Sequence, residues 1–125
     1  MLDKKSVIID KRAKIGKNVI IYENNRIEGD TVIEDNVTIF PNCFISNSII
    51  GKGTKIYSSV VEKSKIGYCS SVGPFAVVRA SRLSGQNKIG SFCELKNSVL
   101  AERENVDAGT ILKVWIKIHH KSIIK

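Results

Sequence analysis

A six-residue rhythm of aliphatic side chains runs through residues 65–98, which read KIGYCSSVGPFAVVRASRLSGQNKIGSFCELKNS. The aliphatic residues are spaced six, six, five, six and six positions apart, at Ile66, Val72, Val78, Leu83, Ile89 and Leu95. Neither an α-helix nor a β-hairpin has this period. A short, fixed repeat of this kind is typical of a parallel β-helix, in which each hexapeptide forms one short strand and one tight corner.

The same rhythm continues without a break on the N-terminal side. Aliphatic residues recur every six positions at Ile9, Ile15, Ile21, Ile27, Ile33, Ile39 and Ile45. The third residue after an aliphatic position is repeatedly Asn, Asp or Gly, at Asn18, Asn24, Asp30, Asn36, Asn42 and Gly53. These residue types tolerate left-handed backbone angles, so the pattern predicts a regular corner after each strand.

Two short motifs give this repeat a family resemblance. Residues 73–76 (GPFA) followed by Arg79 resemble a GPFA..R motif, and residues 89–96 (IGSFCELK) resemble an IGNFVE.K motif. Both belong to the bifunctional N-acetylglucosamine-1-phosphate uridylyltransferase and glucosamine-1-phosphate acetyltransferase. The resemblance is to the left-handed β-helix acetyltransferase half of that enzyme, and the rhythm covers roughly residues 9–117.

The resemblance implies three hexapeptides per turn and a left-handed coil. Counting alone leaves the hand open, because parallel crossovers are otherwise right-handed. We therefore predict an all-β fold, a single-stranded left-handed parallel β-helix of about six coils at about 9–111 within one domain, 1–125. One inward ladder is expected to contain Ile15, Ile33, Ile50, Ile66, Leu83 and Leu100.

The C-terminal part of the chain has a different pattern. From Leu112 to Ile118 aliphatic residues alternate with Lys113, Trp115 and Lys117. A period of two indicates a longer, half-buried strand. Because the open end of a stack exposes unpaired backbone and apolar side chains, we predict a capping strand at 112–118 within a C-terminal cap, 112–125.

Composition and charge narrow the class of protein. The chain has 125 residues, of which 42% are hydrophobic and 26% charged, and these are values of a globular protein. The net charge is +8, and residues 50–100 carry +6 of it, which favours an anionic ligand such as a sugar phosphate. Few aromatic residues and no recognised motif accompany the lysines, so we expect no nucleic-acid partner. The sequence shows neither a leader nor an apolar run of membrane-spanning length, so we expect no membrane association and a cytoplasmic location.

The cysteines and histidines of this sequence predict neither a disulfide framework nor a metal site. The three cysteines, Cys43, Cys69 and Cys93, form no C-x-x-C pair, so neither a disulfide framework nor a zinc site is predicted. Cys43 and Cys93 occupy hexad positions that favour small side chains, and we expect both in the core. The adjacent His119 and His120 are too few for a metal site, so no metal is predicted.

Two cations are the candidate site residues. In the resembled enzyme, the arginine after GPFA and the lysine of F.E.K bind the sugar phosphate, which implies the same role for Arg79 and Lys96. A guanidinium offers paired donors to phosphate oxygens and an ammonium adds a compact charge, so both residue types suit the task. The alternative is that both are ordinary solvated charges on the outside of the β-helix.

The catalytic part of the family pattern does not match. The position of the family's general-base histidine falls on Ala108, and the uridylyltransferase half and the coils that hold acetyl-CoA have no counterpart. We therefore predict a truncated, non-catalytic module that needs no cofactor and serves phosphosugar binding or trimer formation. The alternative is a glucosamine-1-phosphate N-acetyltransferase that uses acetyl-CoA and is completed by another subunit.

The expected partner of the chain is itself. The resemblance implies a homotrimer, because relatives of this fold close a three-fold ring with the active site between subunits. A dimer formed through the strand at 112–118 is the alternative.

Overall fold

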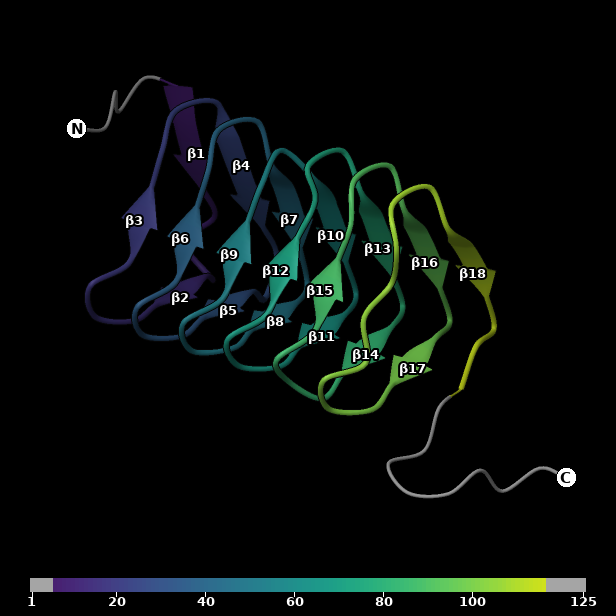
Figure 1. The fold of residues 1–125 in the computed structure, drawn as a ribbon. Coiled ribbons are helices and arrows are strands. Elements are labelled where there is room, and N and C mark those ends of the chain that lie inside the picture. The colour runs from purple at the N-terminus through teal and green to yellow at the C-terminus, as the bar shows by residue number, and fades with distance from the viewer. Residues whose placement is uncertain (1–5, 117–125) are drawn as a thin grey trace, which may run out of the picture.

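The computed structural model describes residues 6–116, and in this range the chain winds as a solenoid of short strands and tight corners (Figure 1). Strands of successive coils stack into three sheets with seven, six and five strands. Every pairing among the named strands is parallel, which confirms the predicted all-β, parallel β-helix of about six coils. No helix within residues 6–116 has the length and apolarity needed to cross a membrane.

The three sheets, called A, B and C here, form the three sides of the solenoid. Sheet A contains β1 (Val7–Ile9), β4 (Asn25–Glu28), β7 (Phe44–Ser46), β10 (Val60–Glu62), β13 (Val77–Arg79), β16 (Glu94–Lys96) and β18 (Ile111–Lys113). Sheet B contains β2 (Lys14–Ile15), β5 (Val32–Ile33), β8 (Ile49–Ile50), β11 (Lys65–Ile66), β14 (Arg82–Leu83) and β17 (Val99–Leu100). Sheet C contains β3 (Ile20–Ile21), β6 (Thr38–Ile39), β9 (Lys55–Ile56), β12 (Ser71–Val72) and β15 (Lys88–Ile89).

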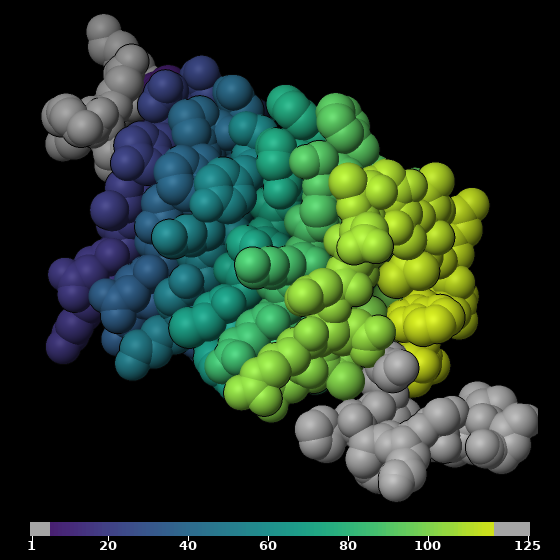
Figure 2. Space-filling view, viewed as in Figure 1, coloured from purple at the N-terminus to yellow at the C-terminus, as the bar shows by residue number. Residues whose placement is uncertain are grey.

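The coil is left-handed, as the family resemblance implied. In Figure 1 the strands of sheet C rise at the front and those of sheet A descend behind them, while the chain advances from the N-terminal to the C-terminal end. Figure 2 shows the same advance on the surface, where successive coils follow one another from the purple end to the yellow end. Residues of one coil therefore meet mainly residues of the coils directly before and after it.

The core consists of three ladders of inward aliphatic side chains, one on each sheet. The predicted ladder is confirmed on sheet B, where register pairs Ile15, Ile33, Ile50, Ile66, Leu83 and Leu100 in turn. Ile15 lies in the first coil and is 40% exposed, whereas its partners in the later coils are buried. Full burial of such a side chain contributes about 1.5–3 kcal/mol, so the interior coils carry the stability.

Left-handed corners occur where the sequence predicts them on two of the three edges. Between sheets B and C the corner residues include Asn18, Asn36 and Gly53, all with positive φ. The prediction of Asp30 as a corner residue is wrong, because the preceding Gly29 adopts the left-handed conformation with a φ of 71°. The edge between sheets A and B turns two residues after the inward aliphatic position, one residue earlier than the other two edges.

Buried hydroxyl groups connect the A–B corners of successive coils. We call this row the hydroxyl spine; its members are Thr31, Ser48, Ser64, Ser81 and Ser98. Ser64 shows the pattern, since its Oγ donates to the Glu62 carbonyl at 2.8 Å and accepts the Ser81 backbone N–H at 3.0 Å. Each hydroxyl accepts the backbone N–H of the equivalent corner position in the next coil, which the short strands leave unpaired.

The two cysteines predicted for the core are buried, Cys43 at 3% and Cys93 at 2% exposure. Cys69 is exposed, and all three thiols are free. Burial raises the pKa of the Cys43 thiol to about 11, because the interior disfavours the thiolate. Cys43 therefore acts as a small apolar side chain with its Sγ 3.2 Å from the Phe40 carbonyl oxygen.

The C-terminal strand differs from its predicted length. β18 closes sheet A at the expected end of the stack, and Leu112 packs against the core. The prediction of one continuous strand over 112–118 is wrong, because Val114 has a φ of 58° and turns the chain. The Val114 N–H donates to the Lys96 carbonyl at 2.8 Å, so the coil repeats its A–B corner there and Ile116 bridges to Val99 on sheet B. Residues 117–125 of the predicted cap lie outside the described residues.

Removing one hydroxyl from the spine should destabilise the protein measurably. We expect Ser64→Ala to lower the free energy of unfolding by about 1–3 kcal/mol, because the buried Ser81 N–H loses its acceptor. Ser71→Ala is the matched control, since Ser71 lies on the outer face of sheet C, and it should stay within about 0.5 kcal/mol of wild type. Urea unfolding followed by circular dichroism measures both values, and equal effects would contradict a specific role for the spine.

Candidate functional site

The two predicted site residues lie side by side on the outer face of sheet A. Arg79 ends β13 and Lys96 ends β16, and the two are register partners. The preceding residues, Val78 and Leu95, point into the core, so the alternation of the strand directs both cations outward. Lys113 of β18 continues the row. The structure therefore forms a row of three cations along the edge where sheet A meets the A–B corner.

One carboxylate borders this row. Glu62 of β10 is the register partner of Arg79, and its Oε1 accepts the Arg79 Nε–H at 2.8 Å. The Arg79 side chain remains 48% exposed in this ion pair. An exposed pair of this kind contributes little to stability, but it fixes the guanidinium and leaves its terminal nitrogens for another acceptor. This arrangement can hold one anionic group between Arg79 and Lys96.

The aromatic residues of the two family motifs also come together. Phe75 and Phe92 stack with ring centroids 5.4 Å apart at the corner between sheets C and A. Both have left-handed backbone angles and are largely exposed, at 59% and 68%. They therefore form an apolar projection on the outside of the coil and are not part of the core.

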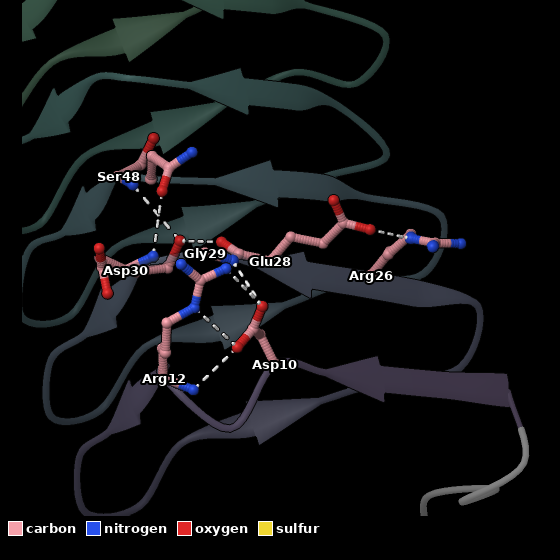
Figure 3. Close-up of polar contacts among 9 residues, drawn as sticks. Asp10, Arg12, Arg26, Glu28, Gly29, Asp30 and Ser48 are labelled. Atoms are coloured by element: carbon pink, nitrogen blue, oxygen red, sulfur yellow. Dashed lines mark hydrogen bonds and ion pairs between the residues drawn. The ribbon is translucent and has the colours of Figure 1, made fainter.

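In the N-terminal coils near the A–B edge, each arginine forms an ion pair with a carboxylate (Figure 3). The Asp10 carboxylate accepts hydrogen bonds from the Arg12 side chain, from the Arg12 backbone N–H at 2.9 Å and from the Gly29 N–H at 3.1 Å. These bonds, the Arg12 side chain first, hold the pKa of Asp10 well below its usual range. Arg26 is paired with Glu28 in the same region. Every arginine of these first coils thus has a carboxylate partner.

The histidine base and the metal ligands of an enzyme site are not found among residues 6–116. Ala108, at the position of the family's general base, is exposed and carries only a methyl group. The described residues, 6–116, include no histidine, because His119 and His120 lie outside them. In the same range no three His, Cys, Asp or Glu side chains gather as metal ligands would.

Sequence reasoning missed three further cations of this edge, Lys63, Lys65 and Arg82. Lys65 and Arg82 are register partners on sheet B, just beyond the corner from Arg79. The signal that could have found them is their separation of one coil, which places their side chains next to each other on the outer face. Aligning the sequence coil by coil, instead of reading its local charge, would have shown the pair.

Comparison with protein families gives one match over nearly the whole chain. A family model described as the GMPPB C-terminal domain matches residues 4–125.

Among curated proteins, several similar sequences are named Bifunctional protein GlmU. The protein of this name from Clostridium kluyveri is 40% identical over 107 residues, which are 85% of this chain and 24% of the relative. The one from Synechococcus elongatus is 38% identical over 107 residues, with the same coverage of both chains. The chain spans about a quarter of the length of these relatives.

Among solved structures, PerB from Caulobacter crescentus, in complex with CoA and GDP-perosamine, has 16% sequence identity and a TM-score of 0.42. The match covers 87% of this chain and 52% of that one.

Proposed function

This chain belongs to the family of GMPPB C-terminal domains, and we propose that it is a non-catalytic, cytoplasmic β-solenoid module that binds a phosphosugar and assembles as a homotrimer. The proposed ligand site is the Arg79–Lys96 pair on sheet A. The free state of all three cysteines supports a reducing compartment.

The observation that carries the phosphosugar proposal is the register of Arg79 and Lys96. Residues 17 positions apart in sequence become neighbours on adjacent rungs, both outward and both cationic. Like charges directly opposite each other in a sheet are unfavourable unless an anion binds between them. A phosphate group would accept paired hydrogen bonds from the guanidinium and a charged one from the ammonium. The similarity to proteins named GlmU, together with the motif resemblance, makes a hexosamine phosphate the first ligand to test.

The lack of a histidine near this pair within residues 6–116 supports a non-catalytic role, since the Glu62 carboxylate beside it is engaged by Arg79. An amine must lose a proton to attack a thioester, and a positioned general base contributes about 10²–10⁴-fold to such a step. The methyl group of Ala108 cannot accept a proton. Acetyl-CoA would become a cofactor only if another subunit supplied the base and completed the site.

The outer face of sheet A supports self-association. Phe44, Val60 and Val77 are register partners on β7, β10 and β13 and form an apolar stripe beside the Arg79 row. All three are half-buried within the single chain. A flat sheet face with a central apolar stripe is suited to packing against copies of itself, and a three-fold ring would cover it in every subunit.

Phosphosugar binding should depend on Arg79 and on ionic strength. We expect glucosamine-1-phosphate to bind weakly, and Arg79→Ala to reduce the affinity about tenfold, because a charge-assisted hydrogen bond to phosphate is lost. Arg26→Ala is the matched control, since Arg26 forms a similar ion pair with Glu28 on the same sheet. Calorimetric titration measures the affinities. Equal losses in both variants would contradict a site at Arg79.

The purified chain should not acetylate glucosamine-1-phosphate. The protein is incubated with acetyl-CoA and the sugar phosphate, and the release of free CoA is measured. We expect the rate of CoA release to equal the rate without protein. Turnover would refute the non-catalytic proposal. The variants H119A and H120A would then show whether either histidine supplies the base.

The chain should be a trimer in solution at micromolar concentration. Light scattering coupled to gel filtration measures its mass directly. Val77→Glu should dissociate the trimer, because it places an unpaired charge in the apolar stripe, whereas Ser71→Glu on sheet C should leave it intact. A wild-type monomer, or a dimer that Val77→Glu does not affect, would count against this interface.

A further inference from the structure

A groove of about 560 Å³ follows the A–B corner in the middle and later coils. Its polar lining includes Asn47, Lys63, Lys65, Arg82 and Asn97. Neither Arg79 nor Lys96 belongs to the lining, so the groove is distinct from the pair on sheet A.

The shape of the groove follows from the side chains at the left-handed corner positions. These positions stack as Asn47, Lys63, Ala80 and Asn97, one from each successive coil. Ala80 has the smallest side chain of the four, so a hollow opens between Lys63 and Asn97. Ile49 and Val99 of sheet B add apolar surface to the lining.

The charge of the groove has one sign. Three cations line it and no carboxylate does. Lys65 and Arg82 are register partners, so two like charges oppose each other directly, which is unfavourable without a counterion. In the part of the chain that the structure describes, no ion pair engages Lys63, Lys65 or Arg82. Glu62, the residue before Lys63, is held by Arg79.

The N-terminal coils contain two ion pairs. There Arg12 is paired with Asp10 and Arg26 with Glu28 (Figure 3). In the coils that form the groove the one ion pair is that of Arg79 with Glu62, so Lys63, Lys65 and Arg82 face the hollow without a carboxylate partner among the described residues. Cations left unpaired beside a hollow attract an anion from solution.

We propose that this groove is a second anion-binding site, which takes the phosphate group of a small organic phosphate. The Arg82 guanidinium binds two phosphate oxygens, and the Lys63 and Lys65 ammonium groups add charge. Asn47 Oδ1 accepts the Asp30 N–H at 3.0 Å, which leaves the Asn47 amide NH₂ to donate to the ligand. Ile49 and Val99 contact the less polar body of the ligand. The proposal does not depend on binding at Arg79 and Lys96.

Calorimetric titration of the full chain with inorganic pyrophosphate tests the groove. We expect K65Q/R82Q to weaken pyrophosphate binding about tenfold or more, since two charged donors are removed. K55Q/K88Q is the matched control, because Lys55 and Lys88 lie on the outer face of sheet C with Ser71 between them, and the change in net charge is the same. The control should bind within about twofold of wild type. Equal losses in the two double variants would overturn the proposal.

A third double variant separates this groove from the sheet A pair. If R79Q/K96Q loses affinity and K65Q/R82Q does not, the groove proposal fails while the phosphosugar site stands. If the reverse is found, the groove stands and the sheet A site fails. In the wild-type protein, pyrophosphate should shift the backbone amide NMR signals of residues 63–65 and 80–82. The absence of these shifts at saturation would also overturn the proposal, whether or not the variants fold normally.

Ligand class is tested with glucose-1-phosphate and inorganic phosphate as paired probes. An organic phosphate should bind more tightly than inorganic phosphate, and Val99→Ser should remove the difference, because Val99 contacts the body of the ligand. Equal affinity for the two probes in the wild-type protein would overturn the assignment to an organic phosphate.

Discussion

Parallel, in-register stacking of coils is the constraint on which this structure depends. Each interior coil buries one aliphatic side chain per sheet directly over that of the coil before it, and the strands themselves have only two to four residues. Such short strands gain stability only as rungs of a continuous stack. Stacking also converts sequence position into geometry, because residues one coil apart lie about 4.8 Å from each other. Every outward position therefore becomes a row, and functional chemistry on this fold must be built from rows.

The sequence predicted the buried aliphatic rows and missed the buried hydroxyl row and several exposed rows. Ile33, Ile50 and Ile66 are recognisable because an inward position accepts only an aliphatic side chain, so the six-residue step is strict. The role of Ser64 was not predictable in the same way, since a serine at a corner is also common in any exposed turn. Its function becomes visible only when stacked coils bring its Oγ to the Ser81 N–H. Local patterns also misled at Val114, where a corner within residues 112–116 looked like the alternation of one strand.

The site residues likewise include some that the sequence identified and some that it did not. Arg79 and Lys96 were identified from motif resemblance, and their adjacency follows from stacking. The pairing of Arg79 with Glu62 was not predicted, because a carboxylate 17 residues away has no local signal. Lys65 and Arg82 were read only as part of a general basic region. Charges on the outside of a solenoid resemble solvated lysines until the coils are aligned and their neighbours are known.

Two arrangements of cations occur along the A–B edge: Arg12 and Arg79 have carboxylate partners, whereas Lys65 and Arg82 lie opposite each other. Cations that only make the surface soluble can lie anywhere on the outer faces. The placement of Lys65 directly opposite Arg82 is unfavourable, since like charges on neighbouring rungs repel each other. The first coils avoid this cost by pairing Arg12 with Asp10. The aliphatic ladder of sheet B runs through both regions, so the fold does not require the opposed cations. An anion bound between Lys65 and Arg82 would remove this repulsion, which is the physical reason for proposing a binding site in this groove.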